Sequence, residues 1–174
     1  SEMCIRDSGN VMGSRGSIIP LFLSEIKNKN IPITDKRMTR FMISLEQGVE
    51  LVWHAFKDMI GGEIYVKKIP SMKVIDIANV IAPNITQEII GIRPGEKLHE
   101  QMISIEDSPY TYEYSDHFKI LPAIHGWNND QLRIGSGKLV SKSFIYTSDQ
   151  NIEWMSPSSL ALWVKKNFND IGNI

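Results

Sequence analysis

Residues whose types and spacing could do chemistry lie in three short clusters, and the clearest is Arg93-Pro94-Gly95-Glu96-Lys97. Proline and glycine favour a tight turn, which would bring Arg93 and Glu96 close together. An arginine can hold a phosphate through paired hydrogen bonds, and a glutamate can accept a hydrogen bond from a sugar hydroxyl. The cluster therefore predicts a site for a phosphorylated, hydroxyl-bearing ligand, with a surface ion pair between Arg93 and Glu96 as the alternative.

The other two clusters are weaker signals. Residues 9–16 form a glycine-rich stretch before a predicted helix, where free backbone amides attract anions and Arg15 adds a positive charge. Residues 34–40 contain the cations Lys36, Arg37 and Arg40, which could bind a phosphate. The simpler interpretations are a strand-to-helix turn for the first stretch and a solvated loop for the second, and the residues alone favour both.

Other patterns lack the residues that their chemistry needs. The stretch 135–139 is similar to a phosphate loop, but leucine stands at position 132 in place of the first glycine and at 139 in place of Ser/Thr. The sequence contains no Gly-x-Gly-x-x-Gly, no tyrosine followed four residues later by lysine, and no nucleophile elbow. The four histidines do not have the spacing of a metal site: His54, His99, His117 and His125. We therefore expect neither a metal site nor a complete set of catalytic residues.

Capping residues and apolar periodicity predict the elements that position these clusters. Helices are predicted after Ser17, Ser44 and Ser71 and from Ser156-Pro157. Strands are expected at 63–66 and 87–92, and one more helix at 96–102. Apolar residues recur at helical spacing as follows: Ile18, Phe22 and Ile26; Leu45, Val49, Val52, Phe56 and Met59; Val74, Ile77, Ala78 and Ile81; and Leu160, Trp163, Val164 and Phe168, the last four expected to face inward. Strands that alternate with helices indicate an α/β architecture.

Composition limits the kinds of partner. A content of 42% hydrophobic residues is enough for a core, and the 174 residues fit one domain or part of a larger one. The net charge of -1 gives no electrostatic basis for binding nucleic acid. No apolar run reaches about 18 residues, so no membrane span is predicted. Cys4 is the single cysteine, which suits a reducing, cytoplasmic location.

In their order and spacing the clusters resemble the extended short-chain dehydrogenase/reductase superfamily, and most closely the inverting UDP-N-acetylglucosamine 4,6-dehydratases of pseudaminic acid synthesis. Four segments carry the resemblance, which covers residues 9 to about 163: 9–20, 32–41, 62–72 and 91–100. The resemblance implies an NAD(P)-binding Rossmann-like domain that binds NADP, joined to a smaller domain that binds UDP-N-acetylglucosamine. The family reaction oxidises C4 of the sugar, eliminates water across C5 and C6, and returns the hydride to C6 with inversion at C5.

The resemblance also assigns roles to single residues. Asn10 matches an asparagine that touches the sugar nucleotide, and Arg93 and Glu96 match an arginine on the pyrophosphate and its partner. The remaining matched positions form two groups: Val11, Met12, Gly13, Ser14 and Arg15 border the nicotinamide end of NADP, and Ile18, Thr34 and Met38 pack around the uridine nucleotide.

One departure from the family pattern leads to a further expectation. The family has Arg-Tyr before the Gly-Asn-Val segment, whereas Asp7-Ser8 stands here. We therefore expect residues 1–8 to be unrelated or disordered, and 9–174 to be the C-terminal substrate-binding portion with the last Rossmann strands. Such a fragment would be inactive and poorly stable alone, whereas the full-length enzyme would be a homo-oligomer. A retaining or capsular dehydratase-epimerase and a non-catalytic UDP-sugar-binding module remain alternatives.

Overall fold

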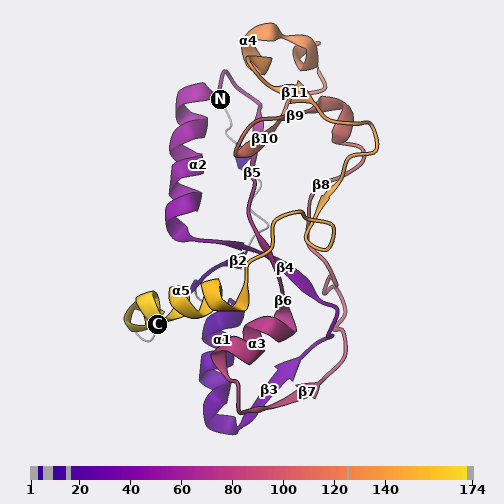
Figure 1. Ribbon diagram of the computed structural model, residues 1–174. Helices are drawn as coiled ribbons and strands as arrows, with labels where there is room; N and C mark the ends of the chain where they lie inside the picture. Colours follow the sequence, from indigo (N-terminus) through magenta and orange to yellow (C-terminus); the bar gives the residue numbers. More distant parts are fainter. Residues whose placement is uncertain (1–3, 6–9, 15–16, 125, 172–174) are drawn as a thin grey trace. The chain divides into compact units, whose positions relative to one another are not determined.

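The structure, a computed structural model, describes residues 4–5, 10–14, 17–124 and 126–171, and these form two compact units (Figure 1). The first unit comprises residues 4–5, 45–68 and 101–147. The second unit comprises residues 10–14, 17–44, 69–100 and 148–171. Each unit contains both strands and helices, so the predicted α/β class is confirmed.

The second unit contains two small sheets and three α-helices. In one sheet β4 (Thr39–Ile43) pairs in parallel with β2 (Asn10–Val11) and antiparallel with β6 (Ser71–Lys73). In the other, β3 (Asn30–Ile33) runs parallel to β7 (Thr86–Ile89). The helices are α1 (Ile18–Glu25), followed by the 3-10 turn η1 (Ile26–Asn28), then α3 (Val74–Ile81) and α5 (Pro157–Ile171).

A single apolar cluster forms the core of the second unit. Helix α3 contacts both α1 and α5 (Figure 1). The predicted inward residue Leu160 of α5 is fully buried in this core. Trp163 and Val164 pack partly against the same cluster, whereas the side chain of Phe168 lies outside the described residues. The prediction for this helix is confirmed where the structure describes it, because helical spacing places Leu160, Trp163 and Val164 on one face.

Two local predictions in the second unit were wrong. Ser71 does not cap a helix: it lies in strand β6, and α3 begins three residues later at Val74. No helix forms over 96–102, where the chain bends and then enters β8 (Gln101–Ile103). In both places pairing with another strand overrides the local helical pattern, because β6 pairs with β4 and β8 pairs with β12 (Tyr146–Thr147).

The first unit is built on a sheet in the order β1-β5-β10-β9-β11. Its strands are β1 (Cys4–Ile5), β5 (Ile64–Lys67), β9 (Thr111–Glu113), β10 (His117–Ile120) and β11 (Lys138–Leu139). The short helix α4 (Gln131–Ile134) and the 3-10 turns η2 (Ser108–Tyr110) and η3 (Trp127–Asn129) complete the segment 101–147. The strand at Cys4–Ile5 was not expected from the sequence, and it pairs in parallel with β5.

Helix α2 (Leu45–Asp58) lies where the sequence predicts a helix. Leu51 and Ala55 are the buried residues, whereas Leu45 and Phe56 are 69% and 59% exposed. The helix has apolar residues on more than one face, so spacing identifies the helix but not the face that is buried.

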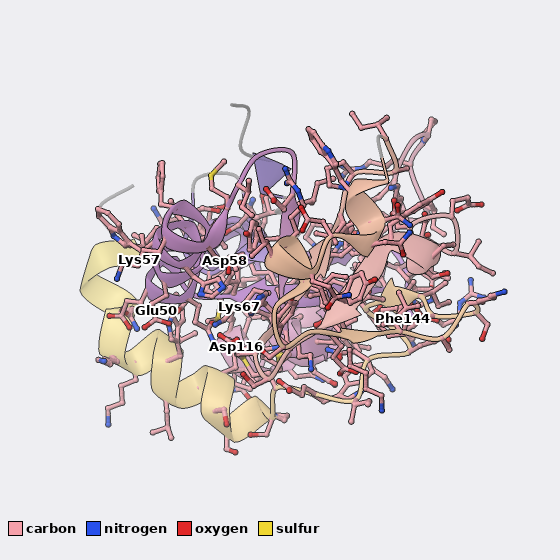
Figure 2. The ribbon with its side chains drawn as sticks, turned by 90° about the horizontal axis from the view of Figure 1, so that it is seen from above. Glu50, Lys57, Asp58, Lys67, Asp116 and Phe144 are labelled. Atoms are coloured by element: carbon pink, nitrogen blue, oxygen red, sulfur yellow. The ribbon has the colours of Figure 1, made fainter. Side chains whose placement is uncertain are left out.

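One face of the first-unit sheet carries several paired ionisable groups. Lys119 of β10 is 3% exposed at its side chain, and its Nζ lies 2.6 Å from Oδ2 of Asp58 on α2. The Tyr65 hydroxyl donates to the same carboxylate at 2.6 Å. Lys67 of β5 pairs with Asp116 at 2.6 Å (Figure 2). The charges of two lysines and two carboxylates thus compensate each other on one face of the sheet.

This network makes the first unit sensitive to acid. Hydrogen bonds from Lys67 and His117 hold the pKa of Asp116 well below its usual value. Burial raises the pKa of Asp58, but hydrogen bonds from Lys119 and Tyr65 outweigh burial and lower it overall. A carboxyl whose folded pKa is depressed stabilises the fold above its unfolded pKa of about 3.9, and this contribution is lost as pH falls through the folded pKa.

We therefore expect the urea midpoint to fall between pH 6 and pH 3, and to fall less in Asp116→Asn. Urea unfolding at several pH values measures this. Asp149→Asn, which changes an exposed carboxyl of the second unit, is the control. If the drop of the urea midpoint between pH 6 and pH 3 became smaller by the same amount in both variants, the acid sensitivity could not be assigned to Asp116.

Candidate functional site

A cavity of about 220 Å³ in the second unit contains most of the residues predicted to bind the nucleotide sugar. Five of the predicted residues line it: Ile18, Thr34, Met38, Arg93 and Glu96. The other lining residues are Leu21, Phe22, Pro32, Arg40, Val74 and Ile90. Pockets that enclose a drug-sized ligand measure roughly 300–1,000 Å³. This cavity therefore suits one part of a nucleotide, such as its base or ribose.

The parallel pair β3–β7 brings the polar residues together. Ile33 pairs with Ile89, and the Ile90 N–H then donates to the Ile33 carbonyl at 2.9 Å. Thr34 follows the end of β3, and the turn containing Arg93 and Glu96 follows the end of β7. Ligands of open α/β sheets bind beyond the carboxyl ends of parallel strands, which is where these side chains lie.

Glu96 connects the two strand ends. Its Oε1 accepts a hydrogen bond from the Thr34 hydroxyl at 3.1 Å, and its Oε2 accepts from the Arg93 backbone N–H at 3.3 Å. Gly95 takes a φ of +82°, which closes the turn between Arg93 and Glu96 in a conformation that glycine adopts easily. The predicted turn is confirmed.

The Arg93 guanidinium is exposed, and within the described part of the chain it forms no ion pair. Arg93 and Glu96 therefore do not form the surface ion pair that was the alternative interpretation. An arginine beside an apolar cavity, with its donors uncommitted, can bind a phosphate at the cavity entrance.

The three cations of residues 34–40 have different surroundings. Lys36 and Arg37 are exposed, as a solvated loop would have them, and Arg37 pairs with Asp35 at 2.7 Å. This hydrogen-bonded pairing lowers the pKa of Asp35 to about 2. For Arg40 the solvated interpretation was wrong, because Arg40 is 7% exposed.

Arg40 of β4 holds the segment 93–100 in place through hydrogen bonds and an ion pair. Its guanidinium donates to the carbonyls of Lys97 and Leu98 at 2.9 and 3.2 Å, and its Nε lies 3.4 Å from Oε1 of Glu100. The Thr39 N–H also donates to the Leu98 carbonyl, at 3.1 Å. Burial lowers the pKa of Arg40, with Glu100 and Glu96 acting in the opposite direction, and a guanidinium stays charged in proteins.

The segment predicted to border the cofactor forms a strand end and a turn. Asn10 and Val11 form β2, and the Ser14 N–H donates to the Val11 carbonyl at 3.1 Å. Met12 is 7% exposed in the core, Gly13 has a φ of +81°, and Ser14 is exposed. Val11, Met12, Gly13 and Ser14 do not line the cavity. Arg15 lies outside the described residues, as does the side chain of Asn10, so their roles stay predictions.

The residues that sequence reasoning missed in this cavity are mainly apolar. Phe22 and Val74 were recognised only as helix-face residues, Pro32 and Ile90 only as parts of the segments 32–41 and 87–92, and Leu21 was not singled out. An apolar residue that lines a cavity has the same local pattern as one in a core, so no sequence signal separates them. Arg40 had the signal of an arginine within a β-branched and aromatic strand, Thr39–Ile43.

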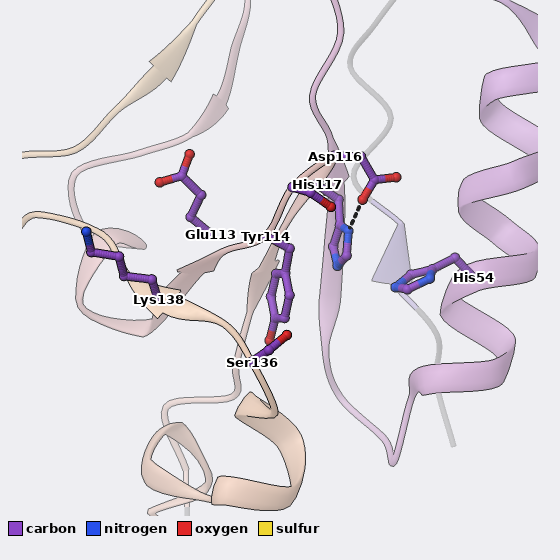
Figure 3. Close-up of a pocket in the computed structure, with 8 residues that line it drawn as sticks. His54, Glu113, Tyr114, Asp116, His117, Ser136 and Lys138 are labelled. Atoms are coloured by element: carbon purple, nitrogen blue, oxygen red, sulfur yellow. Dashed lines mark hydrogen bonds and ion pairs between the residues drawn. The ribbon is translucent and has the colours of Figure 1, made fainter.

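A second cavity, of about 560 Å³, lies in the first unit (Figure 3). It is lined by His54, Glu113, Tyr114, Ser115, Asp116, His117, Ser136 and Lys138. The ring centroids of His54 and His117 are 4.5 Å apart. Sequence spacing did not bring these two histidines together, because one lies on α2 and the other on β10.

In the part of the chain described, no helix is both long enough and apolar enough to cross a bilayer. The described residues also contain no group of three His, Cys, Asp or Glu side chains that could hold a metal ion.

Comparison with known families and proteins gives consistent matches. The family described as polysaccharide biosynthesis protein matches residues 1–122. The inverting UDP-N-acetylglucosamine 4,6-dehydratase of Campylobacter jejuni serotype O:2 is 50% identical over 159 residues, which cover 87% of this chain and 48% of that protein. The UDP-glucose 4-epimerase of Rickettsia canadensis is 38% identical over 123 residues, covering 68% of this chain and 36% of the epimerase. The chain thus spans about half the length of the dehydratases it matches.

A solved structure gives the same fold. The X-ray structure of Pen from Bacillus thuringiensis superposes with a TM-score of 0.76 and 34% sequence identity, covering 91% of this chain and 47% of that one. The expected fold, part of an extended short-chain dehydrogenase of the NAD(P)-binding Rossmann-like type, is confirmed.

Proposed function

Because this chain belongs to the polysaccharide biosynthesis protein family, we propose that it supplies the substrate-binding part of an inverting UDP-N-acetylglucosamine 4,6-dehydratase. The proposed substrate is UDP-N-acetylglucosamine, and the proposed product is the 4-keto-6-deoxy sugar inverted at C5 that serves pseudaminic acid synthesis. The proposal includes a cytoplasmic location and a homo-oligomeric full-length enzyme.

The observation that carries this proposal is the composition of the second-unit cavity. Its wall combines apolar side chains, Ile18, Phe22 and Met38, with Thr34, Arg93 and Glu96 where the parallel strands end. Such a wall suits a flat base, and the uncommitted Arg93 guanidinium suits the diphosphate. Glu96, already held by Thr34 and the Arg93 N–H, is placed to accept a hydrogen bond from a ribose or sugar hydroxyl.

The proposed cofactor is NADP, which when bound would accept a hydride from C4 of the sugar and return it to C6. The turn after β2 fits a position beside it, because Gly13 has a positive φ and Ser14 is exposed at the end of a parallel strand. Val11, Met12, Gly13, Ser14 and Arg15 are proposed to border the nicotinamide, with Asn10 on the substrate side. We assign no proton-transfer step to this chain.

A UDP-glucose 4-epimerase is the second candidate, since the Rickettsia epimerases are similar over two thirds of the chain. Both names specify a UDP-sugar, so both functions use a uridine diphosphate site. The cavity residues do not distinguish the two sugars, and product analysis with UDP-N-acetylglucosamine and UDP-glucose would.

We expect Arg93→Ala to weaken UDP binding about 10- to 100-fold, because a hydrogen bond to a charged group contributes roughly 1.5–3 kcal/mol. Binding of uridine should change little, because uridine lacks the diphosphate. Isothermal titration calorimetry with UDP and uridine measures both.

Arg37→Ala is the matched control, because Arg37 is exposed in the same unit but does not line the cavity. Equal losses of UDP affinity in both variants would indicate a general charge effect and sink the assignment of Arg93 to the diphosphate. Unchanged UDP affinity in Arg93→Ala would do the same.

A further inference from the structure

One of the histidines that line the first-unit cavity, His117, has a buried imidazole nitrogen that lacks a partner among the described residues. His117 is 4% exposed, and its Nδ1 lies 2.9 Å from Oδ1 of Asp116. Asp116 is also paired with Lys67, so its carboxylate accepts and the His117 Nδ1 donates. Nε2 then carries a lone pair. It is buried, and no group in the described part of the chain donates to it.

A buried polar atom without a partner destabilises a protein, so it calls for a ligand or another compensating group. The His117 ring is also held firmly. Tyr114 stacks on it with centroids 4.5 Å apart and an angle of 4°, and the Tyr114 hydroxyl donates to the Ile134 carbonyl at 2.5 Å. The lone pair is therefore fixed in direction.

A second imidazole packs against the His117 ring. The His54 ring is on the other side of His117 from Tyr114, with a centroid distance of 4.5 Å and an angle of 55° (Figure 3). His54 is exposed on α2, so its side chain can turn toward a shared ligand. Two nitrogens bound to one tetrahedral ion, at roughly 2.0–2.1 Å each, lie roughly 3.4 Å apart. The ring centroids are 4.5 Å apart, and rotation of the exposed His54 side chain would bring one of its nitrogens to that spacing from Nε2 of His117.

The arrangement has the features of an imidazole metal site. Metal-bound histidines commonly donate their other N–H to a carboxylate, as His117 does to Asp116. The nearby cations do not oppose an ion strongly, because Lys67 pairs with Asp116 and Lys119 with Asp58. Imidazole selects Cu²⁺, Ni²⁺ and Zn²⁺, whereas Mg²⁺ and Ca²⁺ require oxygen ligands.

We propose that His54 and His117 bind one divalent transition-metal ion of the Zn²⁺ and Cu²⁺ class, with Asp116 orienting His117. The described residues supply no third His, Cys, Asp or Glu ligand, so water or an exogenous ligand from the adjoining cavity would complete the coordination. Such an ion would join helix α2 to strand β10. This proposal is independent of the UDP-sugar site, which lies in the other unit.

Calorimetric titration of the chelator-treated full chain with Zn²⁺ at pH 7.5 tests the proposal. We expect one ion per chain, and a loss of affinity of about tenfold or more in His54→Gln. Asp116→Asn should lose about 10- to 100-fold, as expected for the carboxylate behind a metal-bound histidine. His99→Gln removes an imidazole of the second unit and should leave the affinity unchanged.

Cu²⁺ gives a second readout. Electron paramagnetic resonance should show coupling to two imidazole nitrogens in the wild type and to one in His54→Gln. Thermal unfolding confirms that each variant folds, and saturating Zn²⁺ should raise the wild-type midpoint. The proposal is overturned if Zn²⁺ binds no specific site, or binds equally well in wild type and His54→Gln. Nuclear magnetic resonance showing the two histidines sharing a proton, without Zn²⁺ binding, would also overturn it.

Discussion

Replacing Glu63 with alanine is expected to reduce the free energy of unfolding of the first unit by about 3–5 kcal/mol. Glu63 is 1% exposed and forms a buried ion pair with Arg133, which is itself only 6% exposed. The Glu63 carboxylate also accepts from the Gly61 N–H at 2.7 Å. Removing it leaves the Arg133 charge buried without its main partner, and an uncompensated buried charge is strongly destabilising.

The rest of the Arg133 environment cannot replace Glu63. The guanidinium donates to the Gly61 carbonyl at 2.7 Å and stacks over the Trp127 ring at 4.2 Å. Its remaining carboxylate, Asp130, lies 3.4 Å from Nε and is partly exposed. We therefore expect hydrogen exchange of residues 127–134 to increase most in the variant.

Urea unfolding of Glu63→Ala and Glu50→Ala measures this effect. Glu50 is an exposed glutamate of α2 in the same unit, so its replacement should change stability by less than about 0.5 kcal/mol (Figure 2). Similar midpoints for the two variants would show that the Glu63–Arg133 pair contributes no more than a surface charge.

The second large effect is expected from Leu160→Ala, which should cost the second unit about 2–5 kcal/mol. Leu160 is fully buried in the core shared by α1, α3 and α5. Truncating its side chain removes apolar contacts and leaves a cavity that the surrounding helices fill only partly.

Leu162 provides a control on the same helix. It is 70% exposed, so Leu162→Ala makes the same chemical change without opening a cavity. Thermal or urea unfolding should separate the two variants clearly. Equal destabilisation would mean that α5 does not pack on the core through Leu160.

Local signals predicted the elements well where they agree with the tertiary contacts. The turn at Arg93-Pro94-Gly95, the helix beginning after Ser44 and the inward position of Leu160 follow from turn chemistry, capping and periodicity. These features depend on residues within a few positions of each other. Ser71 and residues 96–102 were mispredicted because strand pairing with distant residues decided their conformation.

The candidate nucleotide site was predicted by resemblance before its geometry was known. Thr34 and Glu96 are 62 positions apart, and only the parallel pairing of β3 with β7 places them in hydrogen-bonding contact. The buried role of Arg40 was mispredicted because cations in a short run are usually solvated, although its position among β-branched and aromatic residues was a signal. The proposed roles of Asn10 and of residues 11–15 stay predictions.

By itself, the sequence determined the α/β class, most helices, the 93–96 turn and the family, because these are encoded in local propensity and in long motifs. Tertiary structure alone decided which of the charged and polar residues meet. It joined Glu63 to Arg133 across 70 positions and placed His54 beside His117. Such pairs are set by strand register and by which face of α2 is buried, and neither is a property of any short stretch of sequence.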